Sequence, residues 1–145
     1  MTPATIIHVD DDGDERQLVE RALEESGFPC RFLGLASGAA LFEHLAHPER
    51  LGGASVLGPT LILLDLNMPP MDGKDVLRRL KASPESSAIP VIMLTSNDSP
   101  SIARECYRLG CASYIRKPDT FSRLVETMKS IGSYWTNTVE LPSHD

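Results

Sequence analysis

The stretch that decides the fold is TLILLDLNMPPMDG, residues 60–73. Its first five residues are aliphatic or β-branched, which is typical of a short strand buried on both faces. The strand ends at Asp65, and the two prolines that follow Asn67 predict a turn. Beyond the turn, Val76, Leu77 and Leu80 form the apolar stripe of an amphipathic helix. A buried strand that leads through a turn into a helix is one βα unit of a layered α/β fold.

The same unit is repeated on both sides of this stretch. Short apolar runs occupy residues 5–9, 30–35, 91–94 and 112–115, and helical patterns follow at residues 13–26, 37–46, 102–109 and 121–131. Strands that are apolar along their whole length predict a parallel sheet covered by helices on both faces. Right-handed crossovers leave few arrangements. We therefore predict a flavodoxin-like (βα)5 fold, with five helices and five parallel strands in the order 2-1-3-4-5.

Composition limits the classes of function. The 145 residues include 41% hydrophobic residues, which suits one domain with one core. The net charge of −6 and the pI near 5.2 argue against a nucleic-acid partner. No apolar run is long enough to span a membrane, and the N-terminus lacks the pattern of a secretory signal. The three cysteines have no framework spacing, which predicts reduced thiols. We expect a cytoplasmic protein without membrane contact.

Polar side chains follow four of the five predicted strands. Asp10 and Asp11 come after the first strand, Asp65 after the third, Thr95 after the fourth and Lys117 after the fifth. The carboxyl ends of parallel strands meet at one edge of a sheet, where ligands bind in such folds. We therefore expect three carboxylates, one hydroxyl and one ammonium to lie close together.

Three neighbouring carboxylates repel one another, and a hard divalent cation such as Mg²⁺ relieves that repulsion. A carboxylate can also be the nucleophile of a phosphoryl transfer, because a metal and an ammonium offset the charge of the phosphoryl oxygens. The acid run of residues 10–15 has a second interpretation as a solvated loop. A calcium-binding loop is disfavoured, because the closing Glu and the ligand spacing are missing. His44 and His47 are interpreted as polar residues near a helix end rather than metal ligands.

Four segments together resemble the sequence pattern of two-component response regulator receiver domains. They are VDDD (residues 9–12), LLDLNMPPMDG (63–73), LTS (94–96) and YIRKP (114–118), and the resemblance covers residues 5–130. It implies that Asp65 accepts a phosphoryl group from a sensor histidine kinase. It implies a phospho-acceptor switch rather than an enzyme, although such domains assist their own phosphotransfer and autodephosphorylation.

The same resemblance implies roles for the other residues. Asp11 and Asp65 would bind Mg²⁺ directly, Asp10 would act largely through water, and the backbone carbonyl of Asn67 would be a further ligand. Thr95 and Lys117 would contact the phosphoryl group. Thr95 and Tyr114 would form the switch, in which Thr95 moves inward and Tyr114 turns into the vacated space. In this family the peptide bond that matches Lys117–Pro118 is usually cis.

The last residues, 131–145, extend beyond the resemblance. The segment IGSYWTNTVELP (residues 131–142) is similar to the tail of single-domain response regulators that partner bacterial phytochromes, and the loop of residues 47–59 fits that group. Tyr134, Trp135 and Leu141 make the tail apolar, so it either folds back on its own domain or forms a subunit contact. Members of that group commonly form homodimers. We therefore predict a homodimer that uses this tail, with a bacteriophytochrome as a candidate kinase.

Two other functions fit part of the same sequence pattern. A haloacid-dehalogenase-like phosphatase also places an Asp nucleophile after its first strand, but Asp14 stands where that family has Thr or Val, and there is no room for a cap domain. A degenerate receiver that never takes phosphate is disfavoured by the intact set of acids, Thr95 and Lys117. With no room for a DNA-binding module after residue 130, the expected output is a protein contact, a phosphorelay step or a phosphate sink.

Overall fold

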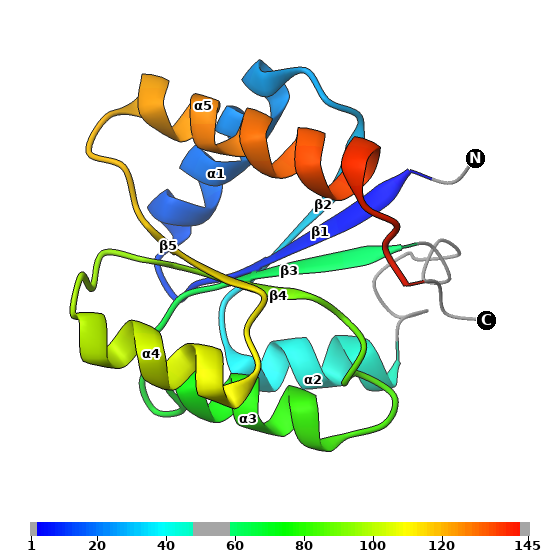
Figure 1. The fold of residues 1–145 in the computed structure, drawn as a ribbon, viewed down its shortest axis with the longest axis vertical. Coiled ribbons are helices and arrows are strands. Elements are labelled where there is room, and N and C mark those ends of the chain that lie inside the picture. Colours follow the sequence, from blue (N-terminus) through cyan, green and yellow to red (C-terminus); the bar gives the residue numbers. More distant parts are fainter. Residues whose placement is uncertain (1–2, 48–58, 143–145) are drawn as a thin grey trace.

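The computed structural model of the chain describes residues 3–47 and 59–142 (Figure 1). Its strands form one parallel sheet in the order β2-β1-β3-β4-β5, which confirms the predicted topology. The strands are β1 (Ala4–Val9), β2 (Cys30–Leu35), β3 (Thr60–Leu64), β4 (Val91–Thr95) and β5 (Ser113–Arg116). The α-helices are α1 (Gly13–Ser26), α2 (Gly38–Ala46), α3 (Gly73–Ala82), α4 (Pro100–Leu109) and α5 (Phe121–Gly132).

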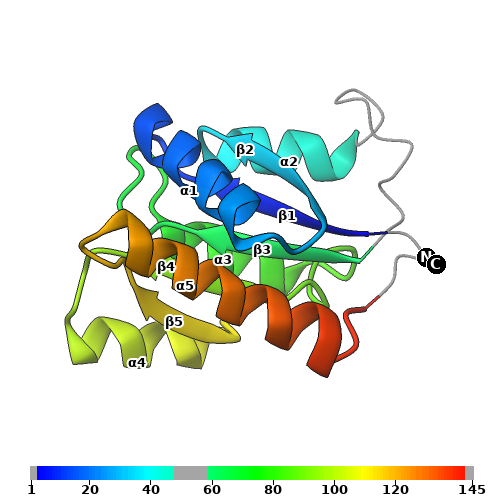
Figure 2. The ribbon, with the colours of Figure 1, turned by 90° about the horizontal axis from the view of Figure 1, so that it is seen from above.

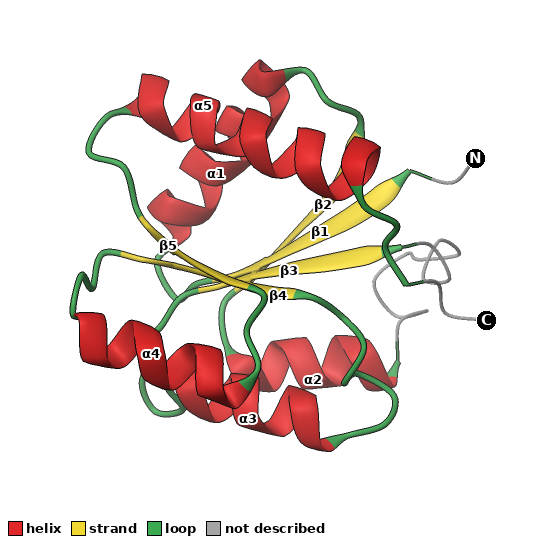
Figure 3. Cartoon of the chain, in the orientation of Figure 1, coloured by secondary structure: helices red, strands yellow, loops and turns green. Residues whose placement is uncertain are grey.

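The helices form two layers on opposite faces of the sheet. Helices α1 and α5 cover one face, and α2, α3 and α4 cover the other (Figures 1 and 3). Seen from above, α1 and α5 lie next to each other over the sheet (Figure 2). Each layer encloses its own apolar cluster, with Leu64 and Met93 in one and Leu63 and Ile92 in the other. Alternate residues of the central strands supply the two clusters, which explains why these strands are apolar along their whole length.

The sequence also sets the ends of the helices. A side-chain oxygen precedes each α-helix and accepts a hydrogen bond from a backbone N–H of the first turn, which satisfies a donor that has no partner within the helix. These caps are Asp12, Ser37, Asp72, Ser99 and Thr120. Asp12, the third acid of the run, is therefore the capping residue of α1.

The end of the chain continues α5 as a short π-helix, η2 (Ser133–Thr138). Trp135 is half-buried and packs against the apolar cluster under α1 and α5, whereas 51% of Tyr134 is exposed. Their rings meet edge to face, with centroids 5.2 Å apart. Part of the tail thus folds back on its own domain, and Tyr134 remains at the surface.

Three further features bear on the predictions. Strand β5 begins at Ser113, one residue later than predicted, and the predicted loop of residues 47–59 falls largely outside the described residues. Among the described residues the cis peptide bond joins Pro69 and Pro70, so the bond between Lys117 and Pro118 is trans, unlike the one usual in the family. None of the described helices has the length and apolar character needed to cross a membrane.

Candidate functional site

The sheet continues one residue beyond three of its strands, and this fixes where the site residues stand. The backbone N–H of Asp10 donates to Leu35 O at 3.0 Å, and that of Asp65 donates to Val9 O at 3.0 Å. The backbone N–H of Lys117 donates to Thr95 O at 2.7 Å. The residues that follow β1, β3 and β5 are therefore held at one edge of the sheet by main-chain bonds, as the sequence predicts.

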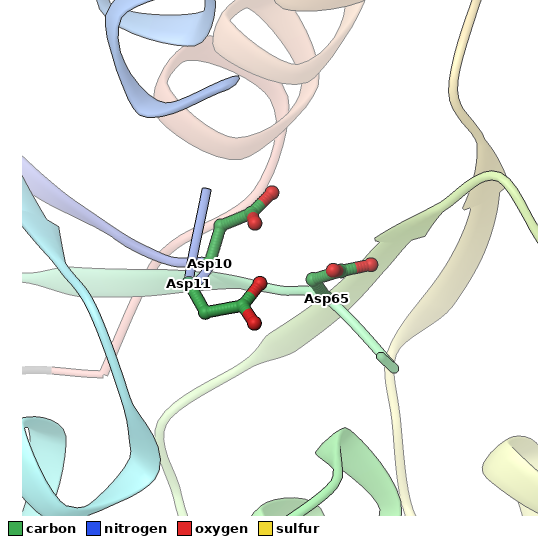
Figure 4. Close-up of side chains that lie close together, drawn as sticks. All are labelled: Asp10, Asp11 and Asp65. Atoms are coloured by element: carbon green, nitrogen blue, oxygen red, sulfur yellow. The ribbon is translucent and has the colours of Figure 1, made fainter. Parts of the chain in front are cut away.

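Three carboxylates meet at this edge. Oxygens of Asp10, Asp11 and Asp65 all lie within 4.8 Å of one another. Figure 4 shows Asp10 and Asp11 leaving the end of β1, beside Asp65 at the end of β3. Asp10 and Asp65 are buried, whereas Asp11 is exposed. Carboxylate oxygens are the donors that Mg²⁺ prefers, and the exposed side leaves room for its waters, so this donor set fits a hard divalent cation.

Lys117 connects these acids. Its Nζ lies 3.1 Å from Asp10 Oδ2, 3.9 Å from Asp65 Oδ1 and 3.6 Å from Glu15 Oε2. The side chain is only 17% exposed. Burial alone would lower the pKa of Lys117, but the charges of Asp65 and Asp10 outweigh it, so the pKa rises above its ordinary value. The ammonium is therefore held charged where it faces Asp65.

Asp65 is the carboxylate whose ionisation the site opposes. Burial raises the pKa of Asp65 above its ordinary value; Lys117 acts against this rise, and Asp10 adds to it. Asp10 is held more firmly, because its Oδ1 accepts from the backbone N–H of Asp12 at 3.0 Å while its Oδ2 faces Lys117. Both oxygens of Asp10 are thus engaged by protein groups, whereas Asp11 is exposed and open to a direct ligand.

Thr95 is the last residue of β4, and Tyr114 is the second residue of the neighbouring strand β5. Thr95 is fully buried, and its Oγ1 accepts from the backbone N–H of Asn97 at 3.2 Å. The hydroxyl of Tyr114 donates to the backbone carbonyl of Asn97 at 2.7 Å. The backbone N–H of Tyr114 in turn donates to the hydroxyl of Tyr107, on α4, at 3.0 Å. Asn97 thus links the predicted switch pair, and α4 is tied to the same strand.

Two residues of this site are absent from the sequence-based set. Glu15, in the first turn of α1, pairs with Lys117; its place in the acid run of residues 10–15 was the available signal. His8 is fully buried on β1, with its Nε2 3.7 Å from Asp10 Oδ2. Burial lowers the pKa of His8 to about 4, although Asp10 acts in the opposite sense. The sequence signal for His8 was a histidine within the apolar run of β1.

Of the remaining predicted residues, those of the tail lie apart from the acids, whereas a backbone hydrogen bond joins Asn67 to Asp65. Asn67 follows Asp65 by two positions, and its side chain is exposed. Tyr134 and Trp135 lie in η2, which is near the amino end of β1 and at the opposite end of the sheet from the acids (Figure 1). Leu141 is half-buried beyond η2. The candidate subunit contact and the acid site are therefore separate regions.

Comparisons with known proteins agree with this geometry. Residues 6–129 match the family model described as the response regulator receiver domain. The chain is 38% identical over 133 residues to the probable methanogenesis regulatory protein FilR2 of Methanothrix harundinacea, covering 92% of this chain and 84% of that protein. It is 31% identical over 141 residues to response regulator Rcp1 of Synechocystis, covering 97% and 95%.

Solved structures extend the comparison. The Mn²⁺-bound form of Rcp1 superimposes with a TM-score of 0.79, covering 97% of this chain and all of that chain. The phosphorylated cyanobacterial phytochrome response regulator RcpA superimposes with a TM-score of 0.85 at 32% identity, covering 97% and 99%. A five-stranded parallel sheet with a cluster of acids at the carboxyl ends of its strands defines the class of protein as a receiver domain. The chain belongs to the response regulator receiver family.

Proposed function

We propose that this chain is a single-domain response regulator that accepts a phosphoryl group on Asp65 from a sensor histidine kinase. The observation that carries the proposal is the position of Lys117, whose Nζ lies 3.9 Å from Asp65 Oδ1 while Asp10 and Asp11 flank the same carboxylate. A carboxylate flanked by two further acids and an ammonium has the charges around it that phosphoryl transfer with a divalent cation requires. The phosphorylated state of the relative RcpA supports the same role.

In the transfer, an Asp65 oxygen forms a bond to phosphorus as the bond from phosphorus to the kinase histidine nitrogen breaks. The imidazole nitrogen leaves with the electron pair of that bond. Lys117 favours the ionised form of Asp65, which is the form that attacks, and its charge offsets the negative charge of the phosphoryl oxygens. The hydroxyl of Thr95, at the end of the adjacent strand, would donate to one of those oxygens. This acid–lysine set would also assist autodephosphorylation, without turnover of a separate substrate.

The donor set supports Mg²⁺ as the resident cation. Asp11 and Asp65 would bind it directly, Asp10 would act largely through water, and the backbone carbonyl of Asn67 would complete the protein ligands. When bound, Mg²⁺ supplies positive charge that offsets the charge of the transferred phosphoryl group. The Mn²⁺-bound structure of the relative Rcp1 supports a divalent site in this family.

The output proposed is a protein contact controlled by Thr95 and Tyr114. The side chains of Thr95 and Tyr114 are each hydrogen-bonded to the backbone of Asn97. A movement of the Thr95 hydroxyl would therefore be transmitted to the Tyr114 ring through this one residue. Phosphorylation shifts a population only through contacts that differ between the two states. The bond from Tyr114 to the Asn97 carbonyl is the contact that we expect to differ.

The partners proposed are a phytochrome-type sensor kinase and a second copy of this chain. RcpA is described as a phytochrome response regulator, and its structure matches nearly the whole length of this chain. Residues 5–130 would form the receiver, and residues 131–145 would form the extension through which Tyr134, Trp135 and Leu141 contact the second copy. Profiling phosphotransfer from a panel of histidine kinases tests the first partner.

The central experiment uses the variant Asp65→Asn, with Asp14→Asn as the matched control. Asp14 is an exposed acid in the first turn of α1, and it does not pair with Lys117. With phosphoramidate and Mg²⁺ as donor system, we expect one phosphoryl group per wild-type and Asp14→Asn chain and none on Asp65→Asn. Persistent phosphorylation of Asp65→Asn would refute the assignment. An unphosphorylated wild type would favour the degenerate receiver, and turnover of a generic phosphate ester would favour the phosphatase.

A further inference from the structure

His8 is a polar residue in a place that otherwise takes only apolar ones. Its neighbours on β1, Ile6, Ile7 and Val9, are all buried aliphatic residues. The His8 side chain is itself fully buried, and neither ring nitrogen has a hydrogen-bond partner among the described residues. A buried polar group without a partner destabilises a fold, and departures of this kind gather at functional sites.

The His8 side chain lies on the face of β1 that leads to the acid site. Side chains two residues apart on a strand point to the same face, so His8 stacks directly before Asp10. Its Nε2 lies 3.7 Å from Asp10 Oδ2, longer than a hydrogen bond but within reach of one by a small rotation of the ring. The other side of the ring faces Phe32, with the two centroids 6.4 Å apart. Asp10 is therefore the acceptor beside the imidazole.

Asp10 Oδ2 has one other donor nearby, the Lys117 ammonium at 3.1 Å. The proposed function draws that ammonium toward a phosphoryl group on Asp65, and Asp10 would then lose it. His8 would remain beside the same oxygen, while the Asp12 N–H holds the other oxygen at 3.0 Å. A donor that stays in place when Lys117 moves would keep the carboxylate facing Asp11 and Asp65.

We propose that His8 is a positioning residue of the cation site: it carries a proton on Nε2 and directs that N–H to Asp10 Oδ2, which fixes the carboxylate toward Asp11 and Asp65. This inference rests on the Mg²⁺ site of the proposed function. Groups that orient the ligands of a metal site change its affinity for the metal when they are replaced, typically by about 10–100-fold. Because Asp10 acts largely through water, the lower end of that range applies to His8.

The test compares three variants of the full chain. His8→Leu removes the donor, and His8→Gln retains an N–H near the position of Nε2. His44→Leu is the matched control, because His44 is also a buried histidine with an unpartnered nitrogen, Nδ1, but lies on α2, against the other face of the sheet from α1 (Figure 1). Mg²⁺ dissociation constants come from calorimetry and melting temperatures from circular dichroism. The proton on the His8 ring is located by ¹⁵N NMR of the wild type.

We expect His8→Leu to weaken Mg²⁺ binding about tenfold because it removes the donor to Asp10 Oδ2, and a melting temperature close to that of the wild type would show that the variant is folded. His8→Gln should bind Mg²⁺ within about threefold of the wild type, and His44→Leu should leave Mg²⁺ affinity unchanged. Equal Mg²⁺ affinity in His8→Leu and wild type would overturn the inference alone, as would a wild-type His8 protonated only on Nδ1. A wild type that binds no Mg²⁺ would overturn the cation site of the proposed function as well.

Discussion

Gly73 is the position at which one added methyl group should disturb the acid site most. A Cβ built on Gly73 would lie 2.2 Å from the backbone oxygen of Asp65 and 2.8 Å from Leu66 Cα. Gly73 has no positive φ, so the glycine is needed for space rather than for its conformation. Its own N–H donates to Leu66 O at 2.8 Å, which holds the start of α3 against the turn after Asp65. Both atoms that would clash with the added Cβ belong to the backbone, so a side-chain rotation cannot relieve the clash.

The size of the disturbance follows from the distances. An ordinary contact begins near 3.4 Å, so Gly73→Ala must separate α3 from the Asp65 backbone by about 1.2 Å. Overpacking of this kind costs about 1–3 kcal/mol, or about 3–10 °C in the melting temperature of a chain of this length. A misplacement of about 1 Å at a reacting group can also slow the chemistry about 100-fold. We therefore expect a folded but weakly phosphorylated variant.

The matched control is Gly13→Ala, at the first residue of α1. A Cβ on Gly13 would lie 3.3 Å from Arg16 Nη2, the far end of a flexible side chain. This variant should keep its stability or gain about 0.5 kcal/mol, and its phosphorylation rate should stay within a few-fold of the wild type. Urea denaturation and the initial rate of phosphorylation by phosphoramidate with Mg²⁺ measure both effects. If Gly73→Ala matched Gly13→Ala in both, the close packing of α3 against Asp65 would have no role.

Three further predictions concern the charge, the switch and the tail. Burial raises the pKa of Asp65 above 3.8, so without Mg²⁺ the stability advantage of Asp65→Asn over the wild type should grow as pH rises from 3.8 and become constant above the raised pKa. Urea denaturation at a series of pH values measures this difference, and a difference independent of pH from 3.8 upward would contradict the prediction. Tyr114→Phe removes the bond to the Asn97 carbonyl, so phosphorylation should proceed while the accompanying NMR shifts on α4 shrink; unchanged shifts would exclude Tyr114 from the switch. Trp135→Ala should shift sedimentation toward monomer, and so should Tyr134→Ala, which leaves the core intact because Tyr134 is 51% exposed; an unchanged dimer in both would exclude the tail contact.

The sheet could be predicted because its strands are decided by local sequence. Every residue of β3 and β4 is buried, so these strands read as uninterrupted apolar runs. Strand β5 was placed one residue too early, because it lies at the edge of the sheet and its residues are half-buried or exposed. An edge strand has one neighbour, and its apolar pattern is correspondingly weak. The π-helix η2 that continues α5 was not predicted for a related reason, since Trp135 contributes only a partly buried side chain to the core.

The meeting of the acids could be predicted because it needs only topology, whereas the contacts of individual side chains could not. Parallel strands bring Asp10, Asp65 and Lys117 to one edge whatever their rotamers. The approach of Glu15 to Lys117 depends on the rotation of α1 about its axis, and Asp12 sets the start of that helix. The burial of His8 next to Asp10 depends partly on the alternation of side chains along β1, which can be read from the sequence. It also depends on which face of the sheet α1 and α5 cover, which cannot be read from it.

The charges at this edge explain why the site suits a switch better than a permanent structure. Four carboxylates, Asp10, Asp11, Glu15 and Asp65, lie beside one ammonium, Lys117. The guanidinium of Arg16 adds a second positive charge, because its Nη1 donates to Asp10 O at 2.7 Å. The protein therefore leaves about two negative charges uncompensated, which is the charge of one divalent cation. A phosphoryl group on Asp65 adds further negative charge, so Lys117 must be divided between Asp10 and the phosphoryl oxygens. Through that redistribution of charge, phosphorylation can act on Thr95 at the end of β4 and, through Asn97, on Tyr114 of β5.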